Sequence, residues 1–119
     1  MGDLTIPIPI IQGGMGVQVS GPHLASAVSN EGALGVLASV GAGEELKSVG
    51  QNYQTRSYQG LLEMLRAARA KTSNPLGVNI MCALTNYADL VKASEEGGAA
   101  VIISGAGLPL RLPSMVKNQ

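Results

Sequence analysis

Short apolar segments alternate along the chain with stretches in which apolar residues recur at helical spacing. The apolar segments are predicted to be strands, and they cover Ile6–Ile11, Leu34–Ala38, Leu76–Met81 and Ala99–Ile103. Strands that are apolar throughout are typical of a parallel sheet covered on both faces. The alternation of strand and helix therefore predicts an all-parallel α/β sheet.

The first predicted helix runs from about 21 to 31. Leu24 and Val28 are four positions apart and share its apolar face. Ser20 is the candidate N-cap, and Pro22 suits the first helical turn because its missing N–H has no partner there in any case.

Two longer helices are predicted farther along, from about 60 to 71 and from Thr85 or Asn86 to about Glu96. Their inward-facing residues are Leu61, Leu65 and Ala68 in the first and Tyr87, Leu90 and Val91 in the second.

Two other segments carry weaker signals. The stretch 44–59 is polar, and Leu46, Val49 and Tyr53 indicate a short helix within it. The segment 108–119 contains two prolines and shows no clear element.

The first strand leads directly into a glycine-rich turn, Gly13-Gly14-Met15-Gly16. Glycine has no Cβ, so the peptide N–H groups of such a turn can approach an anion or the polar edge of a flat ring. The alternative is a tight connection in which Met15 fills the core. A single glycine motif does not decide between the two.

Two polar residues interrupt the apolar pattern. Asn79 lies within the third strand, where a buried amide needs a hydrogen-bonding partner. Gln12 lies between the first strand and the glycine turn, and it could orient that turn by bonding to backbone. Because parallel strands end at one edge of the sheet, Asn79, the glycine turn and the small residues Gly105–Gly107 are expected near one another.

Composition excludes several classes of function. The 119 residues are 45% hydrophobic, with 8 basic and 8 acidic side chains, which gives no electrostatic footprint for nucleic acid or anionic membrane. No apolar run approaches the roughly 18 residues of a membrane helix, and no signal peptide is visible, so a cytoplasmic location is expected. Cys82 stands alone, which excludes an intramolecular disulfide and a cysteine-built metal site. We expect it to act as a small packed hydrophobe, and His23 to be a surface or capping residue.

Two common nucleotide-binding motifs are absent. A dinucleotide-binding fingerprint requires a glycine at Val19 and an acidic residue near Ala38 or Ser39. A phosphate loop requires Gly-Lys-Ser or Gly-Lys-Thr, which the chain lacks.

Four stretches in order resemble the nitronate monooxygenase family, also called 2-nitropropane dioxygenases, which includes the flavin-containing enoyl-ACP reductases. The resemblance covers nearly the whole chain, and the stretches that carry it are Pro9–Gly16, Ala27–Gly35, Gly77–Met81 and Ile103–Pro109. The resemblance implies a TIM (β/α)8 barrel, of which residues 1–119 would form the N-terminal half with about four βα units. It also implies FMN as the cofactor.

The resemblance assigns roles to residues at the strand ends. The flavin ring would lie against Gly14, Met15 and Gly16 and would face Asn79 and Met81, while Gly105, Ala106 and Gly107 would border the substrate side. In the family, the catalytic histidine and the loops that hold the flavin phosphate come from the second half of the barrel, so we assign no catalytic residue in this chain.

Two classes of function remain open. The first is an FMN-dependent oxidoreductase that oxidises alkyl nitronates with O2, or one that reduces an enoyl thioester as the related reductases do. The second is a non-catalytic half barrel, either a binding or assembly module or a truncated remnant. A complete barrel takes about 250 residues, so the last predicted strand would present an open apolar edge. We therefore expect a second copy or a downstream chain to cover it.

Overall fold

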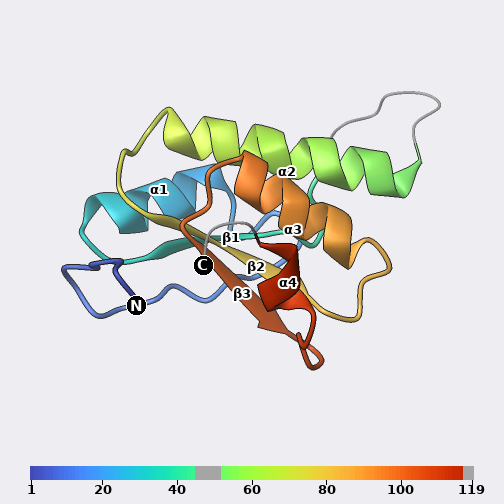
Figure 1. Cartoon of the computed structure of the whole chain (residues 1–119). Coiled ribbons are helices and arrows are strands. Elements are labelled where there is room, and N and C mark those ends of the chain that lie inside the picture. Colours follow the sequence, from blue (N-terminus) through green and yellow to red (C-terminus); the bar gives the residue numbers. More distant parts are fainter. Residues whose placement is uncertain (45–51, 117–119) are drawn as a thin grey trace.

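Three strands form one parallel sheet in the computed structural model, which describes residues 1–44 and 52–116. Figure 1 shows the elements in chain order, which are α1 (Pro22–Asn30), β1 (Gly35–Ala38), α2 (Tyr53–Arg69), β2 (Leu76–Met81), α3 (Tyr87–Glu96), β3 (Val101–Gly105) and α4 (Leu112–Met115). The strand order is β1-β2-β3, and both pairs are parallel. The predicted all-parallel α/β sheet is therefore confirmed.

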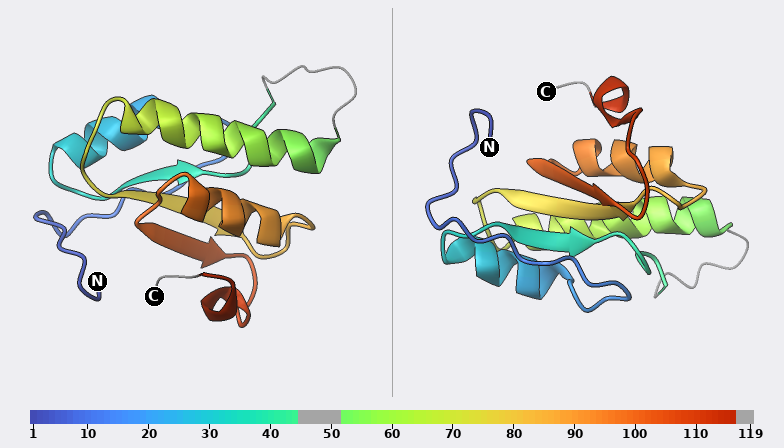
Figure 2. Two further views of the ribbon diagram at one scale, coloured as in Figure 1. Left: turned by 45° about the horizontal axis from the view of Figure 1, so that its top comes forward. Right: turned by 90° about the horizontal axis from the view of Figure 1, so that it is seen from below.

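Helices α1, α2 and α3 lie on one face of this sheet (Figure 2). The alternation of side chains along β2 explains why. Leu76, Val78 and Ile80 are fully buried in the core shared with the helices, whereas Asn79 is half-buried and Met81 is exposed. The helices thus cover one face of β2 and leave the other open.

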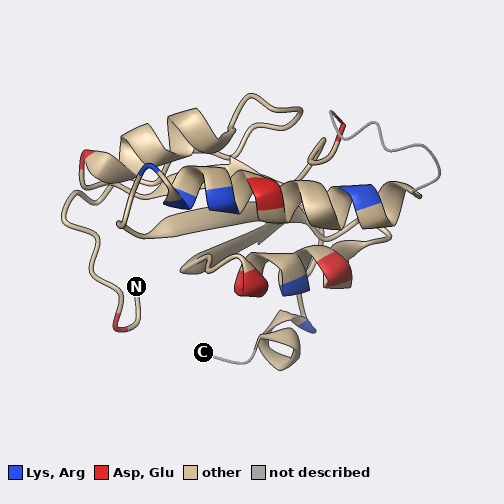
Figure 3. Cartoon of the chain, turned by 90° about the horizontal axis from the view of Figure 1, so that it is seen from above, with Lys and Arg blue, Asp and Glu red and all other residues tan. Residues whose placement is uncertain are grey.

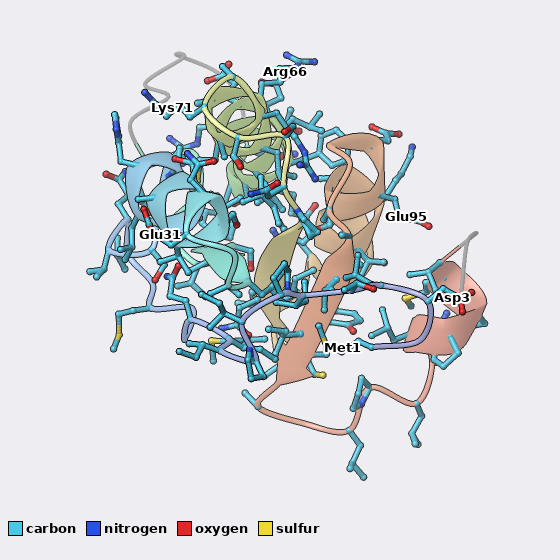
Figure 4. All side chains as sticks on the ribbon, turned by 90° about the vertical axis from the view of Figure 1, so that its left-hand side faces the viewer. Met1, Asp3, Glu31, Arg66, Lys71 and Glu95 are labelled. Atoms are coloured by element: carbon cyan, nitrogen blue, oxygen red, sulfur yellow. The ribbon has the colours of Figure 1, made fainter. Side chains whose placement is uncertain are left out.

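The core between sheet and helices is built from the predicted apolar stripes. Leu61 and Leu65 of α2 and Leu90 and Val91 of α3 are almost completely buried. Charged residues instead lie on the outer surface of α2 and α3, and the strands carry none (Figure 3). Figure 4 places Arg66 at the helix layer, well away from the N-terminal segment that begins at Met1.

The segment predicted as the first strand is not a strand in the described structure. Residues 6–11 contribute a single parallel bridge, between Ile11 and Leu34. Pro7 and Pro9 lack N–H groups, which removes two donors that a longer ladder would need. The pairing with β1 instead continues through the side chain of Gln12, which bonds to the backbone of Val36.

Helix α2 begins earlier than predicted, at Tyr53 rather than near Gly60. Asn52 caps it, because its side-chain Oδ1 accepts the Thr55 N–H at 2.8 Å. Gly60, which was expected to open the helix, lies inside it and allows close packing, since a Cβ there would lie 2.2 Å from the backbone nitrogen of Gly43. Leu46 and Val49, part of the predicted short helix, lie outside the described residues.

Other predicted details of the helices are wrong. Leu24 is 43% exposed, and α1 buries Ala25, Ser26 and Ser29 instead. The N-cap of α1 is Gly21, not Ser20. A short helix, α4, occupies part of the segment that showed no clear element.

A tyrosine on α2 links the two outer helices, because the Tyr58 hydroxyl donates a hydrogen bond to the Glu96 carboxylate on α3. This hydrogen bond, followed by burial and the charges of Glu96 and Asp89, raises the pKa of Tyr58 above its usual value of 10.0. A raised pKa means that the pair stabilises the fold fully below pH 10, and that this contribution is lost as the pH rises through the folded-state pKa.

We therefore expect Glu96→Gln to lower the pKa of Tyr58, as measured by ultraviolet titration of the phenolate. Glu63→Gln on the same helix layer is the matched control and should leave the Tyr58 titration in place. An unchanged Tyr58 pKa in Glu96→Gln would contradict the assigned cause.

Candidate functional site

The carboxyl ends of the three strands meet at one edge of the sheet. The register pairs Ala38 of β1 with Asn79 of β2, and Met81 of β2 with Gly105 of β3. Side chains alternate along each strand, so these four residues lie on the same face, the one that the helices do not cover. This edge therefore carries the predicted residues of β2 and β3 side by side.

The glycine turn lies across the ends of β1 and β2. The Asn79 side-chain Nδ2 donates to the Gly14 carbonyl at 3.1 Å. A Cβ at Gly14 would lie 2.5 Å from the Asn79 Cβ, and one at Gly16 would lie 2.8 Å from the Val40 Cβ. Both contacts are too close for any side chain, so glycine is required at these two positions for the turn to reach the sheet.

The half-buried side chain of Asn79 has one of the hydrogen-bonding partners that a buried amide needs. Its Nδ2 is satisfied by backbone, namely the carbonyl of a residue 65 positions earlier in the chain. Its Oδ1 has no hydrogen-bond partner within residues 1–44 and 52–116. The amide therefore fastens the glycine turn and retains one acceptor.

Two methionines add apolar surface beside these groups. Met15, in the glycine turn, is 62% exposed, and Met81, at the end of β2, is 37% exposed. Met15 therefore lies outside the core between the sheet and the helices.

The loop after β3 adjoins the end of β2. A Cβ at Gly107 would lie 2.9 Å from the Cys82 Cβ, and the Cys82 N–H donates to the Gly105 carbonyl at 2.7 Å. Ala106 has a φ of +53°, in the left-handed region that residues other than glycine seldom adopt. The predicted substrate-side residues thus flank β2 on the side opposite β1.

Cys82 is half-buried and takes part in a small polar cluster that sequence reasoning did not foresee. Its Sγ lies 3.3 Å from the Ser104 Oγ, and the Tyr87 hydroxyl lies 2.6 Å from the same oxygen. Ser104 was overlooked because it belongs to an otherwise apolar strand. The period-two alternation would have placed it on the helix side, opposite Ile103.

Gln12 orients the glycine turn through backbone, as expected. Its Nε2 donates to the Val36 carbonyl at 3.1 Å, and its Oε1 accepts the Val36 N–H at 3.2 Å. The side-chain amide thus imitates a strand residue and extends the pairing along β1 beyond the Ile11 bridge.

The larger grooves lie elsewhere on the molecule. One of about 740 Å³ runs along the outer side of α2, and one of about 510 Å³ lies between α1 and α2, where His23 is exposed at its margin. Neither is lined by a predicted site residue. The candidate site is therefore an open face at the strand ends.

Within residues 1–44 and 52–116, no three His, Cys, Asp or Glu side chains gather in a way that could hold a metal ion. No helix in that part of the chain is both long and apolar enough to cross a membrane.

The solved structures found to be similar to this chain are TIM-barrel proteins. FabK from Thermotoga maritima is 34% identical, with a TM-score of 0.69 over 90% of this chain and 30% of that chain. A point mutant of FabK from the same organism gives 34% identity and a TM-score of 0.70, over 90% of this chain and 31% of that chain. Nitroalkane oxidase from Streptomyces ansochromogenes is 21% identical and supports the fold, with a TM-score of 0.68 over 92% of this chain and 38% of that chain.

The chain thus spans about a third of the length of these proteins. None of the proteins with curated descriptions matches it. The family model described as nitronate monooxygenase matches residues 1–106, which include the glycine turn, Asn79 and the start of the loop after β3. The chain therefore belongs to the nitronate monooxygenase family.

Proposed function

We propose that this chain supplies one wall of the flavin site of an FMN-dependent oxidoreductase of the nitronate monooxygenase type. The observation that carries the proposal is the contact between Gly14 and Asn79, which holds a glycine turn from the N-terminal segment against the carboxyl end of β2. The carboxyl ends of parallel strands are where such sheets and barrels bind their ligands.

The residues of this face suit a planar ring with polar edges. The space beside Gly105 is open, because a Cβ at this position would have no atom of the described residues within 4 Å. Met15 and Met81 offer apolar contact to a ring face, and Asn79 Oδ1 is a hydrogen-bond acceptor without a partner among the described residues. Apolar contacts combined with a few placed polar groups are typical of cofactor-binding sites.

FMN, when bound, supplies the electron chemistry of such enzymes. The role of this chain would be to bind and orient it. Gly14, Met15, Gly16, Asn79 and Met81 would contact the cofactor. The loop of Gly105, Ala106 and Gly107 would border the substrate, and no residue of this chain is assigned as catalytic.

Alkyl nitronates, oxidised with O2, are the proposed substrates. A second candidate activity is reduction of an enoyl thioester, the reaction of the flavin-containing reductases of the family. The 34% identity to FabK, against 21% to nitroalkane oxidase, is the observation in its favour. The residues that would separate the two activities lie beyond the part of the fold that this chain covers.

The test is whether the purified 119-residue chain binds FMN. We expect a visible flavin absorption band that accompanies the chain through gel filtration, with FMN released on denaturation. A colourless chain that neither shifts the spectrum of added FMN nor quenches its fluorescence would contradict the proposal and would favour a non-catalytic assembly module.

We also propose a partner for the open side of the sheet. The edge of β1 is occupied by Ile11 and Gln12, whereas β3 pairs only with β2 within the described residues. All five residues of β3 are half-buried, and none is charged or proline, so the edge carries no protection against further pairing.

The proposed occupant is a polypeptide that carries further parallel βα units of the same barrel. The proteins similar to this chain have about two thirds of their length outside the matched region, which supports this choice. Leu112 and Val116 of the α4 region pack against the core shared with α3. A chain leaving the helix layer there and returning as a strand beside β3 would make the right-handed crossover that parallel sheets require.

Mixing this chain with the unmatched part of Thermotoga maritima FabK tests the proposal. We expect a one-to-one complex by light scattering and slower amide exchange across residues 101–105. Ile103→Lys should abolish the complex, whereas Leu24→Lys on α1 should not. A homodimer protected at 101–105, or the absence of any complex, would contradict it.

A further inference from the structure

Ser20 is a buried residue whose hydroxyl and N–H groups both bond to the glycine turn. It is 1% exposed, and its Oγ accepts the Met15 N–H at 2.8 Å and the Gln12 Nε2–H at 3.0 Å. The same hydroxyl donates to the Gly13 carbonyl at 3.2 Å. One donor and two acceptor positions are all that a serine hydroxyl has, so this one is fully used.

The backbone of Ser20 extends the same connection. Its N–H donates to the Met15 carbonyl at 2.9 Å, and its carbonyl accepts the Ala38 N–H from the end of β1 at 3.1 Å. Gln12, which bonds to Val36, provides a second link between Ser20 and β1. Ser20 therefore connects the turn to β1, as Asn79 connects it to β2.

These bonds occupy three of the carbonyl groups of the turn. The carbonyls of Gly13 and Met15 are held by Ser20, and that of Gly14 by Asn79. The N–H groups of Gly14 and Gly16 have no hydrogen-bond partner among the described residues. These two N–H groups are therefore available as donors, which suit the acceptor atoms of a flavin ring.

We infer that Ser20 is a positioning residue for the flavin site, a role that rests on the proposed function. It does not touch the cofactor. Its hydroxyl engages the carbonyl of Gly13 and the N–H of Met15, so that the turn keeps the shape in which the Gly14 and Gly16 N–H groups stay available. Ser20 was expected from the sequence to be a helix N-cap, a role that Gly21 fills.

The experiment compares Ser20→Ala with Ser26→Ala in the full 119-residue chain. Ser26 is also buried, at 3% exposure, and its Oγ donates to the His23 carbonyl within α1 without touching the turn. In the cofactor-free chain, we expect Ser20→Ala to speed amide exchange at Met15 about tenfold, the effect of losing one hydrogen bond. Ser26→Ala should leave that rate unchanged.

A second variant, Gln12→Glu, tests the same role in case Ser20→Ala does not fold. Gln12→Glu retains the acceptor for the Val36 N–H and removes the donor to Ser20, so it should also speed exchange at Met15. With FMN, Ser20→Ala should weaken binding about tenfold and alter the visible spectrum of the bound flavin, whereas Ser26→Ala should do neither.

The outcomes separate this inference from the proposed function. Unchanged Met15 exchange in both Ser20→Ala and Gln12→Glu overturns the positioning role, whether or not FMN binds. Faster exchange with unaltered FMN affinity overturns its connection to the flavin. If the unmodified chain binds no FMN, the proposed function is wrong, and Ser20 then has no role toward a flavin. The exchange rates of the Met15 amide would still decide whether Ser20 fixes the turn.

Discussion

We expect Gly14→Val to abolish FMN binding while leaving the helix content close to that of the unmodified chain. A Cβ at position 14 would lie 2.5 Å from the Asn79 Cβ, and the atom it meets is the fixed base of a side chain on β2. The turn must therefore move off the sheet, which strains the packing by about 1–3 kcal/mol. It also breaks the Asn79–Gly14 hydrogen bond, worth about 1 kcal/mol.

The measurements are a fluorescence titration of FMN and far-ultraviolet circular dichroism of the same samples. Gly13→Ala is the matched control for folding, because nothing described lies within 4 Å of a Cβ at that position. Its stability should stay within about 0.5 kcal/mol of the unmodified chain. Flavin affinity that survives Gly14→Val would remove Gly14 from the site.

The largest loss of stability is expected from Gly35→Ala, at the contact between α1 and β1. A Cβ there would lie 1.8 Å from the Ala25 carbonyl oxygen and 2.7 Å from the Ser29 Oγ. The Ser29 hydroxyl accepts the Gly35 N–H at 3.0 Å and donates to the Pro75 carbonyl at 2.8 Å. Helix α1 would have to leave the sheet and break both hydrogen bonds.

We expect Gly35→Ala to lower the free energy of unfolding by about 3 kcal/mol or more, at the upper end for inserting a methyl group into a packed site. That is a large fraction of the roughly 5–15 kcal/mol that stabilises a typical domain. Urea denaturation measures it, with Gly105→Ala as the control because its Cβ would meet open space. Equal stability of the two variants would refute the close approach of α1 and β1.

Much of this fold could be predicted from local patterns. The apolar run Leu76–Met81 is β2 with the predicted limits, and the stripe of Leu61, Leu65 and Ala68 is buried on α2. Such patterns report the period of a strand or helix and the side that is buried, which are properties of neighbouring residues. They also identified the family, through motifs that are continuous in the chain.

Other features depended on contacts between distant residues, and no local pattern contains those. Ile6–Ile11 reads as a strand, yet the tertiary structure gives it one bridge and transfers the pairing to the Gln12 side chain. Gly60 looks like a helix boundary and is instead a close contact with Gly43. The Gly60 contact depends on the distance between two backbones, and the Gln12 pairing depends on a side chain that reaches β1.

The features of the candidate site also fall into those that the sequence predicts and those that depend on the tertiary structure. The sequence by itself placed the glycine turn directly after one apolar run and Asn79 within another, because residue type and the spacing of apolar residues are local properties. Only the tertiary structure decided that Asn79 fastens the turn at Gly14, and that Ser20 holds it from the other side. The physical reason is that a hydrogen bond needs its donor and acceptor within about 3 Å, and the folded sheet alone brings these groups to that distance.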